Sequence, residues 1–201
     1  MKTIRYTKMD KQEIINILMT GGILAFPTDT VFGLACAMDK DAIRKVYKAK
    51  GRDFRKPLPV MCDGPEMIKR IAVVNDKAEK IMDRFMPGAL TMVFPKKEEV
   101  DDVFTQGMDT IGIRVPDDEW ILDLIRRMDT PIMVTSANIS GNGSLLKWED
   151  VYACMHGKIN GIVTEDAGGD QASTIIDVTS DEVKVLREGP ISLEEIKEAI
   201  E

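Results

Sequence analysis

The segment GGILAFPTDTVFGLA, residues 21–35, is the most informative part of the sequence for the fold. It begins with a short apolar run that ends in a proline, which is typical of a buried strand leaving a sheet. Thr28, Asp29 and Thr30 follow directly, and Gly33 then permits close approach of the backbone. Polar side chains at a strand end are typical of ligand sites in α/β proteins. The same residues also fit a turn with side-chain caps.

Helical and strand-like patterns alternate on both sides of this segment. Apolar residues that recur every three to four positions predict helices, several of which begin after an Asp or Ser suited to an N-cap. Short apolar runs predict strands. The predicted helices are 10–18, one that begins at Asp39 or Asp41 and ends near Gly51, 64–71, 75–86, 117–128, 147–155 and 192–201. The predicted strands are 21–27, 57–62, 89–95, 111–116, 131–138, 161–165, 173–179 and 182–188.

These elements predict one α/β domain with a mixed sheet over residues 1–201, without a C-terminal extension domain. The last three strands are separated by short turns, which favours antiparallel pairing there. The sequence contains no internal repeat, low-complexity segment or long linker.

Composition excludes several classes of protein. The chain has 201 residues, 44% hydrophobic and 30% charged, which argues against a disordered or fibrous protein. Its 3 cysteines form no CxxC pair, so neither a disulfide framework nor a structural zinc site is expected. We expect the cysteines to be buried as small apolar side chains. The single histidine, His156, is expected at the surface or partly buried. Neither a membrane helix nor a signal peptide is visible, so we expect a cytoplasmic protein that binds no membrane.

The net charge of −7 conceals a basic segment. Residues 44–56 carry +6, so the rest of the chain carries −13. The segment fits either a solvated helix face or an anion site. Because the sequence has neither a P-loop nor a GxGxxG motif, nucleotide binding would rest on cationic side chains. Gly51 is expected to end a helix, and Lys50, Arg52 and Lys56 to project from the loop that follows.

Two further strands end in candidate binding residues. In TIGIRVP, residues 110–116, Thr110, Gly112 and Arg114 are predicted to share one face of a strand. Arg114 suits a ligand carboxylate, although a structural salt bridge is an equal alternative. TSANISG, residues 135–141, suits ribose, base or phosphate recognition, and equally an Asx turn or helix cap.

Six motifs occur in an order that resembles the YrdC-like family of threonylcarbamoyl-AMP synthases. They are FPTDTVFGLA (26–35), KAKGRDFRKPLPV (48–60), TIGIRVP (110–116), TSANISG (135–141), STIID (173–177) and LREGP (186–190). The resemblance implies a YrdC-like twisted, mixed parallel and antiparallel sheet with surrounding helices and a large concave cavity.

The resemblance also implies a reaction. L-threonine, bicarbonate and ATP would become L-threonylcarbamoyl-AMP and pyrophosphate, and a t6A transferase complex would then modify adenosine 37 of tRNAs that read ANN codons. Mg²⁺ is expected to arrive with the nucleotide, and no residue is expected to hold a metal. Binding of tRNA would be at most weak or indirect.

The resemblance assigns residues to each substrate. Those expected to bind nucleotide are Lys50, Arg52, Lys56, Thr110, Ser136, Asn138, Ser144 and Arg187, and the first three are also expected to be catalytic. Those expected to surround threonine are Thr28, Thr30, Arg114, Thr135 and Ser173, with Arg114 taking the carboxylate. No side-chain nucleophile is required, because the carbamate of threonine itself attacks the α-phosphate.

The sequence departs from the family pattern at a few positions. Met61 and Cys62 stand where many members have a histidine, Phe32 replaces a common tyrosine, and residues 140–146 lack a frequent Pro and Thr. These departures leave open a related enzyme with another substrate. An RNA-binding module is a further alternative, which the acidic remainder of the chain disfavours.

Overall fold

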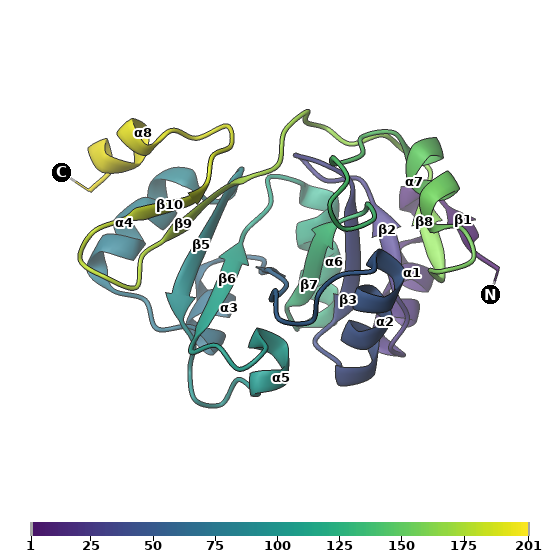
Figure 1. Cartoon of the computed structure of the whole chain (residues 1–201), viewed down its shortest axis with the longest axis horizontal. Helices are drawn as coiled ribbons and strands as arrows, with labels where there is room; N and C mark the ends of the chain where they lie inside the picture. Colours follow the sequence, from purple (N-terminus) through teal and green to yellow (C-terminus); the bar gives the residue numbers. More distant parts are fainter. Residues whose placement is uncertain (1, 201) are drawn as a thin grey trace.

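The computed structural model describes residues 2–200 and contains one mixed sheet in the order β1-β8-β2-β3-β7-β4-β6-β5-β9-β10 (Figure 1). The strands are β1 (Ile4–Tyr6), β2 (Leu24–Phe26), β3 (Gly33–Ala37), β4 (Val60–Met61), β5 (Leu90–Pro95), β6 (Thr110–Arg114), β7 (Ile132–Ser136), β8 (Gly161–Val163), β9 (Thr174–Asp177) and β10 (Lys184–Arg187). Parallel and antiparallel pairs are both present, so the expected mixed sheet is confirmed.

The helices surround this sheet, and six of those within residues 2–200 begin at a residue whose side chain accepts a hydrogen bond from the first turn. They are the 3₁₀ helix η1 (Lys8–Asp10) and the α-helices α1 (Lys11–Met19), α2 (Lys40–Lys50), α3 (Pro65–Ile71), α4 (Asp76–Phe85), α5 (Asp102–Thr105), α6 (Glu119–Met128), α7 (Trp148–Met155) and α8 (Leu193–Glu198). Asp39 caps α2, and Gly51 ends it with a φ of 59°, a backbone conformation that glycine adopts readily. No helix within residues 2–200 is both long and apolar enough to cross a bilayer.

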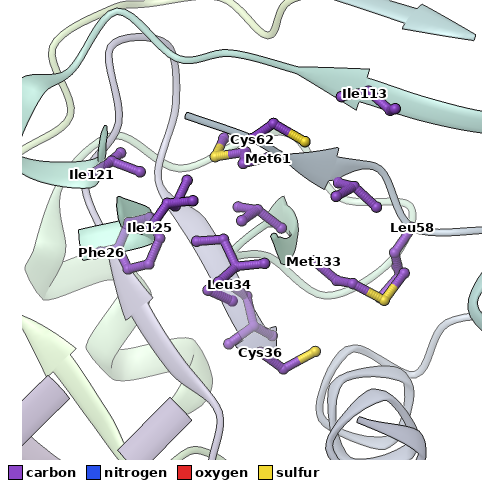
Figure 2. Close-up of a cluster of buried hydrophobic side chains, with 14 of the residues drawn as sticks. Phe26, Leu34, Cys36, Leu58, Met61, Cys62, Ile113, Ile121, Ile125 and Met133 are labelled. Carbon is purple, nitrogen blue, oxygen red and sulfur yellow. The ribbon is translucent and has the colours of Figure 1, made fainter. Parts of the chain in front are cut away.

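The main core lies between the sheet and helices such as α6. Figure 2 shows Phe26, Leu34 and Met133, from three neighbouring strands, gathered with Ile121 and Ile125 of α6. All five side chains are buried in one hydrophobic cluster. Burial of this apolar face leaves the opposite face of the central strands available for a cavity.

The structure corrects the predicted topology in two respects. Strands β1 and β3 and the short helices η1 and α5 were not predicted, because residues 33–37 follow a polar turn and the other three segments are short. The prediction of antiparallel pairing is confirmed for β9 with β10 but is wrong for β8, which runs parallel to β1 and β2. The chain leaves β8 and crosses to the other half of the sheet before β9 begins (Figure 1). Helix α8 ends before residue 201, which lies outside the described residues.

Burial of two cysteines predicts a simple thiol-labelling result. Cys36 and Cys62 are fully buried, and burial raises the pKa of both thiols, that of Cys36 to about 12. Cys154 is partly exposed. Because the thiolate is the reactive form, we expect an aromatic disulfide reagent to modify only Cys154 in native protein and all three thiols in guanidinium. Rapid labelling of a native Cys154→Ser variant would contradict this.

Candidate functional site

A cavity of about 470 Å³ opens on the face of the sheet that carries the predicted site residues. Its volume falls in the range of about 300–1,000 Å³ that is common for small-molecule sites. Strands β3, β4, β5, β6, β7, β9 and β10 contribute to its walls, together with the loops that contain residues 28–32 and 57–59. The hydroxyl-bearing lining residues are Thr28, Thr30, Thr91, Thr110, Thr135, Ser136 and Ser173, and the charged ones are Arg52, Arg114, Asp177 and Arg187.

Strand β6 places its side chains as the alternating pattern predicts. Thr110, Gly112 and Arg114 line the cavity, whereas Ile111 and Ile113 are buried in the core on the other face. The shared face expected for Thr110 and Arg114 is therefore confirmed.

The loop between β2 and β3 turns two hydroxyls inward. Thr28 Oγ1 lies 3.0 Å from Thr30 Oγ1 and donates to the Val31 carbonyl over 2.7 Å. The Thr30 amide donates to Thr28 Oγ1 over 3.1 Å. Both threonines are buried and line the cavity, so the capped turn and the cavity wall are the same structure.

Arg114 is the most buried cation of the cavity wall, with 5% of its surface exposed. Its Nε donates to the Gly88 carbonyl over 2.9 Å, Nη1 to Thr30 Oγ1 over 2.6 Å and Nη2 to Asp29 Oδ2 over 2.6 Å. Burial lowers the pKa of Arg114, while the charge of Asp29 and its hydrogen bond act in the opposite direction. Arginine has five N–H donors, so these three bonds leave two for a ligand.

A second cation, Arg187, lies on β10 beside Ser173. Its Nη2 donates to the Ser173 carbonyl over 2.7 Å and to Ser173 Oγ over 3.1 Å. Ser173 Oγ also lies 2.8 Å from Thr91 Oγ1. Burial lowers the pKa of Arg187, and the nearby charge of Arg114 lowers it further. Two guanidinium groups therefore stand near each other in one cavity, an arrangement that favours anionic ligands.

Three features of the site were not predicted from the sequence. They are the presence of Thr91 and Asp177 in the cavity wall and the pairing of Asp29 with Arg114. Thr91 lies within the apolar strand 89–95, where its neighbours Leu90 and Met92 are buried in the core. The alternation of that strand was the signal that could have found it, because a threonine opposite a core face points into whatever covers the other face.

The expectation that Lys50 projects from a loop is wrong. It is the last residue of α2, and only 1% of its surface is exposed. Its ammonium donates to the carbonyls of Ser136 and Asn138, the latter over 2.8 Å, and to Asn138 Oδ1 over 3.2 Å. Burial lowers the pKa of Lys50 to about 8. Lys50 thus joins α2 to the 136–138 turn and is not a lining residue of the cavity.

Arg52 and Lys56 occupy the loop after α2, and only Arg52 lines the cavity. Arg52 Nε donates to the Lys56 carbonyl over 3.2 Å, and Nη2 to the Pro57 carbonyl over 3.1 Å. The Tyr47 hydroxyl donates to the same Lys56 carbonyl over 2.7 Å. The loop backbone is therefore tied down while the Lys56 side chain is exposed.

The 135–144 segment is divided between the cavity and its surroundings. Thr135 and Ser136 line the cavity. Asn138 lies behind them, where it accepts from Ser136 Oγ over 2.5 Å and donates to the Asn142 carbonyl over 2.5 Å. Ser144 is exposed and lies outside the lining. The Asn138 side chain therefore ties this turn together, but within the described residues no backbone amide donates to its Oδ1, so neither the Asx turn nor the helix cap is observed.

The structure brings most of the predicted site residues to one cavity. Those that line it are Thr28, Thr30, Arg52, Thr110, Arg114, Thr135, Ser136, Ser173 and Arg187, and those that do not are Lys50, Lys56, Asn138 and Ser144. Their roles in binding nucleotide or threonine stay predictions. The departures from the family pattern also reach the wall, because Phe32 and Met61 line it with apolar surface.

Comparison with known proteins gives a consistent result. The model of the family of Sua5, YciO and YrdC proteins, described as telomere recombination, matches residues 16–189. Threonylcarbamoyl-AMP synthase of Pyrococcus abyssi is 40% identical over 185 residues, which are 90% of this chain and 54% of that protein. The enzyme of the same name from Bacillus subtilis is 39% identical over 188 residues, 92% of this chain and 54% of that protein.

A solved structure agrees with these relatives. Sua5 of P. abyssi in complex with L-threonine superposes with a TM-score of 0.90 at 35% identity, covering 99% of this chain and 60% of that one. The chain thus spans about half the length of the curated relatives that it matches.

Proposed function

Because the chain belongs to the Sua5, YciO and YrdC family, we propose that it forms L-threonylcarbamoyl-AMP and pyrophosphate from L-threonine, bicarbonate and ATP. The observation that carries the proposal is Arg114, a buried cation of the cavity wall that keeps two N–H donors for a ligand carboxylate. The related P. abyssi protein is known in complex with L-threonine. The t6A modification of tRNA, transfer of the product by partner proteins and a cytoplasmic location belong to the same proposal.

The two substrates are assigned to two parts of the cavity. Threonine occupies the end formed by Thr28 or Thr30 with Arg114, Thr135 and Ser173, which offers hydroxyls and a guanidinium. The nucleotide occupies the remainder, where Arg52, Thr110, Ser136 and Arg187 present cations and hydroxyls. Lys56, from the exposed part of the 52–57 loop, and Ser144 reach the nucleotide only if their segments move toward it.

The chemistry requires placement and charge neutralisation and no side-chain nucleophile. The amine of threonine and bicarbonate give a carbamate with loss of water. A carbamate oxygen then attacks the α-phosphate, and the bond to the leaving pyrophosphate breaks. Arginine side chains of the cavity bind the phosphates and neutralise the negative charge that develops on the leaving group.

Mg²⁺ enters the proposal as an ion carried by the nucleotide. No group of three or more His, Cys, Asp or Glu side chains in the described part of the chain is arranged to hold a metal ion. The phosphates would therefore supply ligands for the ion, whose chemistry is to neutralise phosphate charge.

Pyrophosphate release tests the proposal directly. We expect release from ATP and Mg²⁺ to require both L-threonine and bicarbonate, and mass spectrometry to detect the threonylcarbamoyl adenylate. The alternative is a related enzyme with another substrate, which is suggested by the apolar Met61 in the cavity wall. A panel of L-serine, L-valine and L-alanine tests this alternative. Release that is insensitive to L-threonine, or faster with another amino acid, would contradict the proposal.

A further inference from the structure

Asp29 forms an ion pair with Arg114 but is not itself a lining residue of the cavity. The two side chains are 14% and 6% exposed, and Asp29 Oδ2 lies 2.6 Å from Arg114 Nη2. Arg114 lines the cavity and Asp29 does not. A ligand in the cavity therefore meets Arg114, and Asp29 acts on that ligand only through Arg114.

Asp29 is itself held in place from two directions. The Asp117 amide donates to Asp29 Oδ2 over 3.1 Å, and the Gly168 amide donates to the Thr28 carbonyl over 2.8 Å. A Cβ at Gly169 would lie 2.7 Å from the Asp29 carbonyl oxygen, so the 168–169 backbone is packed directly against this loop. Asp29 Oδ1 is buried without a hydrogen-bond partner among the described residues, so the carboxylate is positioned by the bonds to Oδ2 and by the packed loop backbone.

Asp29 and Thr30 accept from different terminal nitrogens of Arg114, and Gly88 accepts from Nε. Three acceptors around a planar guanidinium fix both its position and its plane. The directions of the two remaining N–H groups are then fixed as well. Since Asp29 also offsets the charge of Arg114, a ligand carboxylate is recognised by the geometry of these two donors more than by net charge.

We propose that Asp29 is a positioning residue that aims Arg114 at the carboxylate of the amino-acid substrate. The inference rests on the proposed function, because it assumes that L-threonine binds in this cavity. Its consequence is specific: loss of Asp29 weakens recognition of the carboxylate and leaves the rest of the substrate's contacts unchanged.

The experiment compares L-threonine with L-threoninamide, which lacks the carboxylate, by calorimetry on wild-type protein and on Asp29→Asn. We expect Asp29→Asn to bind L-threonine about 10- to 100-fold more weakly, the scale of a misplaced hydrogen bond to a charged group. Binding of L-threoninamide and the KM for ATP are expected to change by less than about twofold. The preference for the carboxylate therefore shrinks in the variant.

Asp123→Asn is the matched control, because Asp123 also pairs with cations, Lys11 at 2.5 Å and Arg127 at 3.0 Å, but lies on α6 away from the cavity. It is expected to retain the wild-type preference. Asp29→Ser, which leaves room for a water beside Arg114, is a second variant, and thermal melting establishes which proteins are folded.

Four results would overturn the inference. Equal weakening of both ligands would show a merely structural role, and so would failure of both Asp29 variants to fold. A preference retained by folded variants would overturn this inference alone. By contrast, a wild-type protein that binds no L-threonine would overturn the proposed function and, with it, the role of Asp29.

Discussion

Replacement of Arg114 by glutamine is expected to reduce the efficiency of threonine-dependent pyrophosphate release by about a hundredfold or more. The change removes the two N–H donors and the charge that remain for the substrate carboxylate. A hydrogen bond to a charged group contributes about 1.5–3 kcal/mol, and each 1.4 kcal/mol corresponds to roughly a tenfold change. The measurement is steady-state kinetics with each substrate varied separately. The loss is expected in the KM for threonine, with ATP binding nearly unchanged.

The same substitution is expected to destabilise the fold, because it leaves Asp29 without its cation in a largely buried position. Breaking a buried ion pair from one side costs about 3–5 kcal/mol. The double variant Arg114→Gln/Asp29→Asn removes the uncompensated charge and should recover part of this loss in guanidinium unfolding. A double variant less stable than Arg114→Gln would contradict the account, and equal kinetic losses for threonine and ATP would contradict the binding role.

The sequence predicted those parts of the site that depend on local geometry. Alternation along residues 110–114 placed Thr110 and Arg114 on one face, because successive side chains of any strand point to opposite sides. The end of the helix at Gly51 followed equally from local chain chemistry, since glycine accepts the left-handed backbone conformation. The hydroxyl-rich strand ends also proved to lie at a cavity.

The parts that could not be predicted depend on contacts between distant residues. Asp29 and Arg114 are 85 positions apart, and Lys50 and Asn138 are 88 apart. Which strands become neighbours decides whether such side chains meet, and the short β4 between β7 and β6 carries no pattern that reveals its place. A lysine at the end of a basic helix therefore looks solvent-exposed until the turn that covers it is known.

Lys50 is expected to contribute strongly to stability, because its ammonium is the shared donor for three oxygens of the 136–138 turn. Lys50→Met keeps most of the side-chain stem and removes every donor. Asn138 Oδ1 still accepts from Ser136 Oγ, and the Ser136 carbonyl still accepts from the Asn138 amide, so the loss falls on the Asn138 carbonyl. A buried acceptor left without a partner costs about 1–3 kcal/mol, so we expect a loss of about 2 kcal/mol and a melting temperature lower by about 6 °C. Differential scanning calorimetry measures both quantities.

Lys48→Met is the matched control, because Lys48 lies in the same last helical turn and is exposed. It removes the same charge from the helix end, where the dipole favours cations by about 0.3–1 kcal/mol, so its melting temperature should fall by only a few degrees. A Lys50→Met variant that melts like Lys48→Met, but has a raised KM for ATP, would contradict the structural role and place the ammonium on the nucleotide.

The pH dependence of the Lys50→Met effect provides an independent check. Burial lowers the pKa of Lys50 from 10.5 to about 8 in the folded protein. Between these two values the unfolded chain binds more protons at this residue than the native protein does, so the contribution of Lys50 to stability rises with pH. The difference in unfolding free energy between wild type and Lys50→Met should therefore widen from pH 7 to pH 10 in guanidinium titrations. A difference that narrows over this range would contradict the lowered pKa. It would mean that the native protein binds the proton of Lys50 more tightly than the unfolded chain does, because the three acceptors stabilise the ammonium by more than burial destabilises it.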